Sequence, residues 1–516
     1  MPISISDIST AFSQATTFGA TSNLNIEQVS IDSRSLLNNR QTIFFALKGI
    51  HYDAHRFIAE VVSQGVQTIV VSELPENFDS KITWFLVPDT MKALQEFASF
   101  YRKKYKFPIV GITGSNGKTI VKEWLNFLLS PDFNIIRSPK SYNSQVGVPL
   151  SVLGINDFHE FGIFEAGIST FNEMKFLEAI IQPTIGILTT IGSAHDEGFE
   201  NLGQKIKEKL LLFKNVDVLI YRKNKTIDSF ISPFTPTFSW SSTEKEADLF
   251  VKFQIESESC LVEINDNEQE HKIYLPFSDD ASLENAMHCV AMLVYLKYDW
   301  NTIAERVLLL YPIQMRLQLK KGIQNTSVID DSYSADFQSL KIALDFLENQ
   351  KQHNKKTIII SDIYQSGLSN EALYTRLSQL LISSKINRVI CVGNEISQFQ
   401  KKFVNATCFP STDALIEAFP TLDFYNETIL IKGARSFAFE KIVALLEERT
   451  HETVLEINLN AISHNLNYFK AKLNKSTLLM AMVKAFGYGS GGVEIAKLLA
   501  YQKVDYLGVA FTDEGI

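Results

Sequence analysis

Cysteine is scarce in this chain, with only four residues in 516 and no paired spacing among them: Cys260, Cys289, Cys391 and Cys408. Such scattered thiols argue against a disulfide framework or a zinc motif, so we expect small buried side chains. No run of about 18 apolar residues occurs, and the amino terminus lacks the basic and then apolar pattern of a signal peptide. We therefore expect a cytoplasmic protein that does not insert into membranes.

Basic residues are also not in excess. Lys and Arg number 49 against 58 Asp and Glu, which gives a net charge of -9. This balance argues against broad binding to nucleic acid or to anionic membranes, although it permits a local basic pocket. The chain is too long for one core, since domains usually have about 100 to 200 residues, and three or four domains are expected.

Strand-like and helix-like segments alternate through most of the chain. This alternation predicts the α/β class, with mostly parallel sheets covered by helices on both faces. The expected domains are residues 1–106, 107–316, 317–450 and 451–516. The expected strands are 42–47, 67–71, 84–87, 109–113, 162–165, 185–190, 327–330, 357–361, 388–392, 428–431, 454–459 and 478–483, with an antiparallel excursion up to residue 273 and helices at 91–101, 439–448 and 492–499.

The segment 109–119 indicates a nucleotide phosphate site, because an apolar strand runs into a glycine-rich loop and then into a helical pattern. Glycines let backbone N–H groups approach phosphate oxygens. Lys118 adds a positive charge, and the Thr119 hydroxyl can join a Mg²⁺ shell. The first glycine of the general pattern would fall on Ile112, where this chain offers Gly111 and Gly114 instead. The predicted phosphate-binding residues are Gly114, Ser115, Asn116, Gly117, Lys118 and Thr119.

A second group of polar residues follows two neighbouring strand-like runs. Glu165 ends one run, and His195 follows the other. Ligands of open parallel sheets bind at the carboxyl ends of strands, so both side chains should face the phosphate loop and could hold Mg²⁺ with Thr119. Taken by itself, His195 would be interpreted as a capping or core histidine and not as a metal ligand. The nearby lysines at 205, 207 and 209 would, on composition, form a solvated helix face.

Candidate residues also occur in the third region. Asp330 and Asp331 end a strand, with Arg316 upstream and Lys432 and Arg435 after a later strand. These acids could cap a loop, or they could grip a ribose, phosphate or amino-acid substrate in a crevice between domains. Asn285 begins an apolar helix and could either cap it or hydrogen-bond a base.

These motifs together resemble the Mur ligases of peptidoglycan synthesis. The ordered set is residues 111–119, Glu165, Ser193-Ala194-His195, Asn285, Asp330-Asp331-Ser332-Tyr333 and Lys432-Gly433-Ala434-Arg435. The amino-terminal segments 32–34, 44–49 and 53–57 are similar to the UDP-substrate domain of the members that join D-alanyl-D-alanine to UDP-N-acetylmuramoyl-tripeptide. The resemblance covers roughly residues 25 to 448 and implies a three-domain ligase with a central phosphate-loop sheet.

The resemblance implies a role for each matching residue. Lys118 and Thr119 would bind ATP phosphates and Mg²⁺, with Glu165 and His195 near the metal, and Asn285, Arg316 and Asp331 would contact the nucleotide. Lys209 stands where the family carries a carbamylated lysine, which acts in catalysis and at the metal. The implied substrate-binding residues are Ser33, Arg34, Lys48, Asn143, Gln145, Lys432 and Arg435. The chain departs from the family at Asn143-Ser144, where paired asparagines are usual, and at residues 333–337.

The last segment carries a lysine at the end of an apolar strand, Lys484, followed by glycines. A structural lysine is the default for such a pattern, but a desolvated lysine can form a Schiff base. With residues 455–459 and 465–466, this segment resembles the start of the alanine racemase (β/α)8 barrel. Lys484 would then carry pyridoxal phosphate, and Tyr488 would contact its phosphate. A complete barrel needs about 250 residues, so we expect only its first part here and no racemization by this chain.

The implied reaction is an ATP-dependent amide ligation. The tripeptide carboxylate would attack the γ-phosphate, and the D-alanyl-D-alanine amine would displace phosphate from the acyl phosphate. Closure of the third domain would bring Arg316, Asp331 and Arg435 onto the nucleotide. Two alternatives remain: a phosphate-loop kinase, and a nucleotide-sensing scaffold for a fused racemase, the latter suggested by the altered segments at 143–144 and 334–337.

Overall fold

The computed structural model divides the chain into two compact units, Met1–Glu448 and Arg449–Ile516. It describes residues 3–20, 25–36, 39–49, 52–139, 141–192, 198–256, 259–266, 269–313, 317–333, 335–350, 352–364, 368–448, 457, 459–470, 472–474, 477–489, 491–502 and 504–515. Within these ranges, every helix is too short or too polar to span a bilayer. All four cysteines are described as free thiols; Cys260, Cys289 and Cys391 are buried, as expected, whereas Cys408 is partly exposed.

The first sheet of the larger unit has the order β2-β7-β6-β5-β4, and only β2 is antiparallel to its neighbour. Its apolar strands confirm the expected runs, and an amphipathic helix follows where the sequence predicts one. The bounds are β2 (Thr16–Phe18), β4 (Gln28–Ser30), β5 (Thr42–Phe45), β6 (Thr68–Val71), β7 (Thr83–Leu86), α1 (Ile5–Ala11), α2 (Ile58–Ser63) and α3 (Thr90–Arg102).

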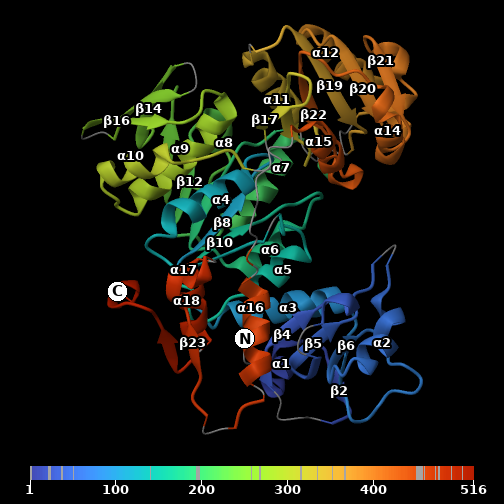
Figure 1. Cartoon of the computed structure of the whole chain (residues 1–516), viewed down its shortest axis with the longest axis vertical. Coiled ribbons are helices and arrows are strands. Elements are labelled where there is room, and N and C mark those ends of the chain that lie inside the picture. Colours follow the sequence, from blue (N-terminus) through green and yellow to red (C-terminus); the bar gives the residue numbers. More distant parts are fainter. Residues whose placement is uncertain are drawn as a thin grey trace. The chain divides into compact units, whose positions relative to one another are not determined.

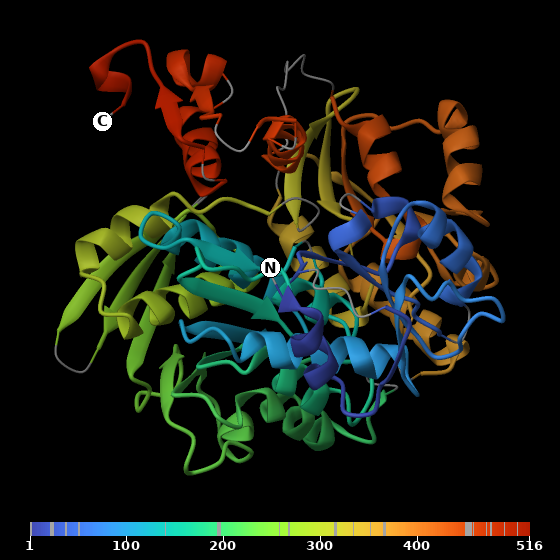
Figure 2. The same ribbon diagram turned by 90° about the horizontal axis from the view of Figure 1, so that it is seen from below.

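The central sheet has the order β16-β15-β14-β13-β12-β11-β8-β10-β9. Figure 1 labels several of its strands, and Figure 2 shows the same ribbon from below. Strands β8 to β14 are parallel, and β14, β15 and β16 form the expected antiparallel excursion. The strands are β8 (Ile109–Thr113), β9 (Ile135–Arg137), β10 (Phe161–Glu165), β11 (Ile185–Leu188), β12 (Val218–Arg222), β13 (Thr237–Ser241), β14 (Leu249–Ile255), β15 (Cys260–Asn265) and β16 (Glu270–Leu275). The main helices are α4 (Lys118–Leu129), α5 (Gly147–Val152), α6 (Met174–Ile181), α7 (Leu202–Leu210), α9 (Asp280–Tyr295) and α10 (Trp300–Leu308).

Alternating residues of β8 enter different cores. Ile109 belongs to a cluster that continues into the first domain, whereas Val110 and Ile112 pack with residues of α4 and α9. The predicted helix after the phosphate loop is confirmed as α4, and its apolar side chains are buried. Strand β11 ends at Leu188, two residues before the expected end, because Thr189 and Thr190 turn to bond the phosphate loop.

A buried arginine joins the first domain to the central one. The Arg102 guanidinium donates to the carbonyls of Ile181 at 2.9 Å and Gln182 at 3.1 Å, at the carboxyl end of α6, and to that of Tyr105 at 2.6 Å. A cation is favourable at this end of a helix. Burial nevertheless lowers the pKa of Arg102 to about 10. The contact therefore fixes α3 against the central domain.

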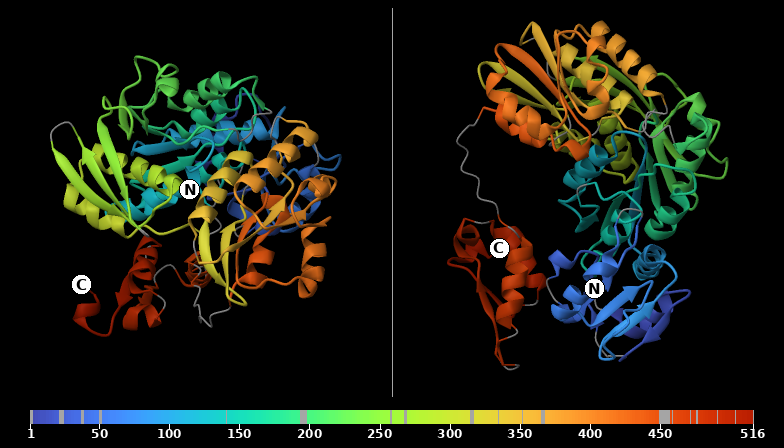
Figure 3. Two further views of the ribbon diagram at one scale, coloured as in Figure 1. Left: turned by 90° about the horizontal axis from the view of Figure 1, so that it is seen from above. Right: turned by 90° about the vertical axis from the view of Figure 1, so that its right-hand side faces the viewer.

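The third sheet has the order β17-β18-β22-β19-β20-β21, in which only β17 is antiparallel. Helices cover both of its faces over two separate cores (Figure 3). The bounds are β17 (Gln318–Gly322), β18 (Thr326–Asp331), β19 (Lys355–Ser361), β20 (Arg388–Val392), β21 (Ala406–Phe409), β22 (Glu427–Lys432), α11 (Phe337–Asn349), α12 (Asn370–Ser383), α14 (Thr412–Ala418) and α15 (Glu440–Leu446). The three sheets lie in residues 16–86, 109–275 and 318–432, and domain boundaries near 106 and 316 remain our proposal.

The smaller unit is built around two parallel strands, β23 (Met480–Met482) and β24 (Tyr506–Gly508), with α18 (Gly492–Tyr501) between them in the chain. Its small core centres on Val483, Ile495 and Leu499. The prediction of a strand at 454–459 falls mostly outside the described residues, and it is wrong at Leu459, which begins helix α16 (Leu459–Lys470). A helical backbone there keeps Leu459 out of strand pairing.

His288 gives the central domain a pH-dependent stability. Its ring is fully buried and accepts a hydrogen bond from the Trp240 indole at 3.2 Å. Burial lowers the pKa of His288 from 6.5 to about 4. Between these values the unfolded chain binds a proton that the folded chain does not, so stability falls as pH falls from 6.5 to 4, by up to about 3 kcal/mol.

We expect His288→Gln to reduce this acid sensitivity. The measurement is the urea midpoint of unfolding at pH 7 and pH 4.5, for wild type and variant. The control is His353→Gln at a partly exposed position, which should leave the pH dependence as in wild type. Equal pH dependence of His288→Gln and wild type would contradict the prediction.

Candidate functional site

The phosphate loop connects β8 to α4 and depends on two glycines. A Cβ on Gly114 would lie 2.0 Å from Thr189 Oγ1, and one on Gly117, where φ is +87°, would lie 2.2 Å from Asn285 Oδ1. Neither position accepts a side chain. The Lys118 ammonium folds over the loop and donates to the carbonyls of Gly114 at 2.8 Å and Ser115 at 2.9 Å. The predicted residues 114–119 thus form the loop and the start of helix α4.

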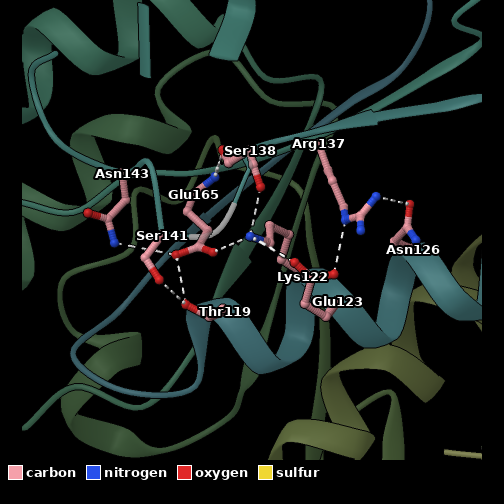
Figure 4. Close-up of polar contacts among 9 residues, drawn as sticks. All are labelled: Thr119, Lys122, Glu123, Asn126, Arg137, Ser138, Ser141, Asn143 and Glu165. Carbon is pink, nitrogen blue, oxygen red and sulfur yellow. Dashed lines mark hydrogen bonds and ion pairs between the residues drawn. The ribbon is translucent and has the colours of Figure 1, made fainter. Parts of the chain in front are cut away.

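Glu165 lies beside this loop, at the carboxyl end of β10, and its side chain is fully buried. Its Oε2 accepts hydrogen bonds from Thr119 Oγ1 at 3.1 Å and from Asn143 Nδ2 at 3.4 Å (Figure 4). Ser141 Oγ lies 3.3 Å from Thr119 Oγ1. The expectation that Glu165 and the loop share an edge of the sheet is confirmed, because β8 and β10 are parallel neighbours.

Lys122 is part of this cluster, although the sequence did not single it out. Its side chain is completely buried, and its Nζ lies 2.9 Å from Glu165 Oε1 and donates to the Ser138 carbonyl at 2.8 Å. The signal available was a lysine inside the apolar pattern of a helix that follows a phosphate loop. Lysines are almost never fully buried unless they are paired.

Lys209 approaches the loop from helix α7. Its ammonium donates to the Gly114 carbonyl at 3.0 Å, and its side chain is 2% exposed. Burial, together with the positive charges of Lys118 and Lys205, holds the pKa of Lys209 well below its ordinary value. The interpretation of this helix as a solvated lysine face, based on composition, is wrong for Lys205, which is buried, and holds for Lys207, which is exposed; Lys209, which the family resemblance had set apart from that face, is also buried. The Lys205 ammonium bonds the Gly192 carbonyl.

Two predicted residues, His195 and Arg316, lie outside the described residues, as does the whole of Ser193-Ala194-His195. Among the residues that the structure describes, no three His, Cys, Asp or Glu side chains form a metal-binding group. Asn285 is buried beside Gly117. Its role as a helix cap is wrong, since Asp279 caps α9 by accepting from the Ser282 N–H. Asn285 therefore faces the phosphate loop.

The predicted substrate-loop residues separate into two environments. Asn143 faces Glu165, as described above. The Gln145 side chain instead accepts from Gln95 Nε2 of α3 at 3.0 Å and donates to the Glu173 carbonyl at 3.2 Å. Gln145 thus ties the loop to the first domain.

The third-domain candidates meet at the carboxyl ends of β18 and β22. Asp331 and Lys432 are register partners, and their side chains form a buried ion pair with 2.6 Å between Oδ2 and Nζ. Arg435 pairs with Glu440 at 2.9 Å and lies over the Tyr333 ring at 5.9 Å. Arg435 is therefore the more accessible of the two predicted cations.

Two of the first-domain candidates, Ser33 and Arg34, lie in a short 3-10 helix, Ser33–Ser35, and Lys48 lies after β5. Arg34 is 85% exposed and forms a two-pronged contact with Asp32, at 2.9 and 2.7 Å. Lys48 Nζ donates to Glu73 at 2.8 Å, and the buried Ser33 hydroxyl lies 3.5 Å from Glu60 Oε2. Arg34 thus offers an accessible guanidinium.

In the smaller unit, Lys484 is separated from β23 by Val483, and its Nζ lies over the Tyr488 ring at 5.9 Å from the centroid. The intervening residues have positive φ, from 53° at Ala485 to 63° at Gly487. A left-handed turn therefore brings the two predicted side chains together. The backbone N–H of Ala485 donates to Glu514 at 2.9 Å.

Comparisons with known families agree with this geometry. The model of the Mur ligase middle domain matches residues 112–293, and that of the Mur ligase glutamate ligase domain matches residues 315–435. The model of the alanine racemase N-terminal domain matches residues 457–516. The first two matches contain the phosphate loop, Glu165, Lys209 and the third-domain candidates.

Similar proteins come from several bacteria. The UDP-N-acetylmuramoyl-tripeptide–D-alanyl-D-alanine ligase of Rickettsia prowazekii is 28% identical over 81% of this chain and 95% of its own length. That of Bacillus subtilis is 26% identical over 82% and 93%. Among solved structures, MurF from Acinetobacter baumannii matches with a TM-score of 0.75 at 22% identity, over 86% of this chain and 98% of its own. This last likeness establishes the fold.

Proposed function

The chain belongs to the Mur ligase family, and we infer that its larger unit joins D-alanyl-D-alanine to UDP-N-acetylmuramoyl-tripeptide with conversion of ATP to ADP and phosphate. This is an amide ligation in the synthesis of peptidoglycan precursors. The observation that carries the inference is the meeting of Lys118, Glu165 and Lys209 around the phosphate loop, inside the region that matches the family. We place the reaction in the cytoplasm, where ATP and UDP-linked precursors are available.

The residues beside the loop fit a magnesium ion. Glu165 Oε2 and Thr119 Oγ1 are 3.1 Å apart, and oxygen atoms of this kind are the ligands that Mg²⁺ prefers. We propose that Thr119 and Glu165 hold Mg²⁺, with His195 and a carbamylated Lys209 near it. When bound, the ion would neutralise negative charge on the ATP phosphates.

The protein's own groups would then favour an acyl phosphate route. The substrate carboxylate attacks the γ-phosphorus of ATP, and the bond to the bridging oxygen of ADP breaks. The amine of D-alanyl-D-alanine next attacks the acyl carbon, loses a proton, and expels phosphate. Lys118 and the loop N–H groups would stabilise charge on the transferring phosphoryl group. Asn143, Lys432 and Arg435 would bind substrate, and Asn285, Arg316 and Asp331 the nucleotide.

Lys209 is our candidate for carbamylation. It is buried, and its ammonium points at the phosphate loop, where it donates to the Gly114 carbonyl. Carbon dioxide reacts with neutral amines, and the lowered pKa of Lys209 favours the neutral form. The product would carry a negative charge where the neutral amine carries none, near the positive charges of Lys118 and Lys205.

The first domain would receive the UDP end of the substrate. We propose Ser33, Arg34 and Lys48 as its contacts. The rings of Tyr52 and Phe57 are stacked with centroids 6.2 Å apart and are 52% and 37% exposed, which suits stacking of a planar base. The accessible Arg34 guanidinium suits a diphosphate.

The ligation is tested by ADP release from the purified chain. We expect release only when UDP-N-acetylmuramoyl-tripeptide and D-alanyl-D-alanine are both present. Equal ATP hydrolysis without either substrate would contradict a ligase. A stable phosphorylated product would favour a kinase, and nucleotide binding without ligation in any mixture would favour a scaffold. Parallel reactions with lysine and diaminopimelate tripeptides identify the third residue of the peptide.

The smaller unit is proposed to be the start of a racemase barrel, in which Lys484 would bind pyridoxal phosphate and Tyr488 its phosphate group once the barrel is complete. The described part pairs only two strands, whereas a closed barrel of this type has eight. We expect this 516-residue chain not to interconvert L- and D-alanine. Chiral chromatography of alanine after incubation with pyridoxal phosphate checks this, and turnover of L-alanine would contradict it.

A further inference from the structure

Lys122 is a fully buried cation to which the proposed ligation assigns no role. Its Nζ lies 2.9 Å from Glu165 Oε1 and 3.0 Å from Glu123 Oε1, and it donates to the Ser138 carbonyl at 2.8 Å (Figure 4). An ammonium group has three N–H donors. The Ser138 carbonyl accepts a hydrogen bond from this ammonium, and the two carboxylates lie close enough to form ion pairs with it.

Stability alone is a weak reason for such a pair. Glu165 and Lys122 are both 0% exposed, and burying two charges costs about as much as their attraction returns. Apolar side chains of similar volume often serve as well or better at such places. The ion pair instead determines the direction of the Glu165 carboxylate.

The two oxygens of Glu165 have different neighbours. Oε1 faces Lys122, whereas Oε2 faces Thr119 Oγ1 at 3.1 Å and Asn143 Nδ2 at 3.4 Å. Ser138 contacts both members of the ion pair. Its hydroxyl accepts a hydrogen bond from the Glu165 N–H at 3.2 Å, and its carbonyl accepts one from the Lys122 ammonium. Rotation of the carboxylate would break contacts at both ends.

We propose that Lys122 is a positioning residue of the ligase, which occupies Oε1 of Glu165 so that the carboxylate presents only Oε2 to Thr119 and to a divalent cation. This rests on the proposed function, in which Glu165 holds Mg²⁺. Mg²⁺ requires close to octahedral geometry with short bonds, so a single, well-directed carboxylate oxygen suits it better than a freely rotating group. Partners behind a metal ligand commonly change affinity 10- to 100-fold when removed.

The outer end of the network supplies a matched control. Glu123 Oε2 pairs with Arg137 Nε at 3.0 Å, and Arg137 Nη1 donates to Asn126 Oδ1 at 3.4 Å (Figure 4). Glu123→Gln removes a charge next to Lys122 but keeps an oxygen for its ammonium and leaves the contact with Glu165 in place. We therefore expect Glu123→Gln to leave the Glu165 carboxylate in place and metal binding close to that of wild type.

The experiment measures Mn²⁺ binding by electron paramagnetic resonance, in the presence of a non-hydrolysable ATP analogue. We expect Lys122→Met to weaken binding roughly tenfold and Glu123→Gln to stay within about twofold of wild type. If Lys122 acts through Glu165, the double variant Lys122→Met/Glu165→Gln should bind as weakly as Glu165→Gln alone. Additive losses, or wild-type binding by Lys122→Met, would overturn the proposal.

Two further outcomes distinguish a failure of the positioning role of Lys122 from a failure of the proposed function. Failure of the wild-type protein to bind Mn²⁺ with the nucleotide would count against the proposed function itself. If Lys122→Met does not fold, a crystal structure of the wild-type protein with Mn²⁺ and the analogue decides: one bond from the metal to Oε2, with Lys122 on Oε1, supports positioning. A bidentate carboxylate, or a metal on Oε1, overturns it.

Discussion

Replacing Lys118 by methionine is expected to lower kcat/KM for ATP about 1000-fold, which corresponds to about 4 kcal/mol of transition-state stabilisation. The ammonium lies over the phosphate loop, held by the carbonyls of Gly114 and Ser115. Nucleotide phosphates entering the loop would bring negative charge within its reach. Methionine keeps most of the volume of the side chain and removes the charge, so the loss should be mainly electrostatic.

The measurement is coupled ADP release with both substrates saturating, together with calorimetric titration of the ATP analogue. If Lys118→Met loses less affinity for the ATP analogue than it loses in kcat, Lys118 acts mainly on the transferring phosphoryl group. Lys207→Met makes the same change on exposed surface of α7 and should retain activity within about twofold. A Lys118→Met enzyme within tenfold of wild type would contradict the assigned role.

The phosphate loop and its neighbours could be predicted because the signals are local. Residues 109–119 combine a strand, glycines and a helix within one short segment, and the structure places them as β8, the loop and α4. The position of Glu165 beside the loop could be predicted from a general rule, because the carboxyl ends of parallel strands lie at the same edge of a sheet. The end of β11 was predicted two residues too late, because Thr189 and Thr190 bond the phosphate loop, more than 70 residues earlier: the Thr189 hydroxyl donates to the Asn116 carbonyl, and the Thr190 carbonyl accepts from the Ser115 N–H.

Burial of charged residues could not be predicted in the same way. Lys122 looks like an interruption of an apolar helix face, and its partners come from Ser138 and from Glu165, on separate segments. Lys205 and Lys209 look like a solvated face, whereas tertiary packing buries them. For Gln145, the family pattern indicated a substrate contact, but Gln95 from another domain pairs with it. Such pairings exist only after the chain has folded.

Replacing Lys209 by methionine is expected to abolish most ligation, with a loss of about 1000-fold in kcat. If Lys209 is carbamylated, its neutral amine forms a bond to the carbon of CO₂ and releases a proton, leaving an anion beside Lys118 and the Gly114 carbonyl. Methionine cannot form this anion. Removal of bicarbonate should therefore also reduce wild-type activity, and added bicarbonate should restore it without affecting the variant.

Labelling separates a carbamate from an ordinary catalytic lysine. Wild-type protein equilibrated with ¹³C-bicarbonate should give one carbamate carbonyl resonance that Lys209→Met lacks and Lys207→Met retains, since Lys207 lies on the same helix but is exposed. Formate or acetate, which can supply a carboxylate in the space left by a shortened side chain, should restore part of the activity of Lys209→Ala. A fully active wild-type enzyme with no carbamate resonance would instead leave Lys209 as a cation or a neutral hydrogen-bond donor to the loop.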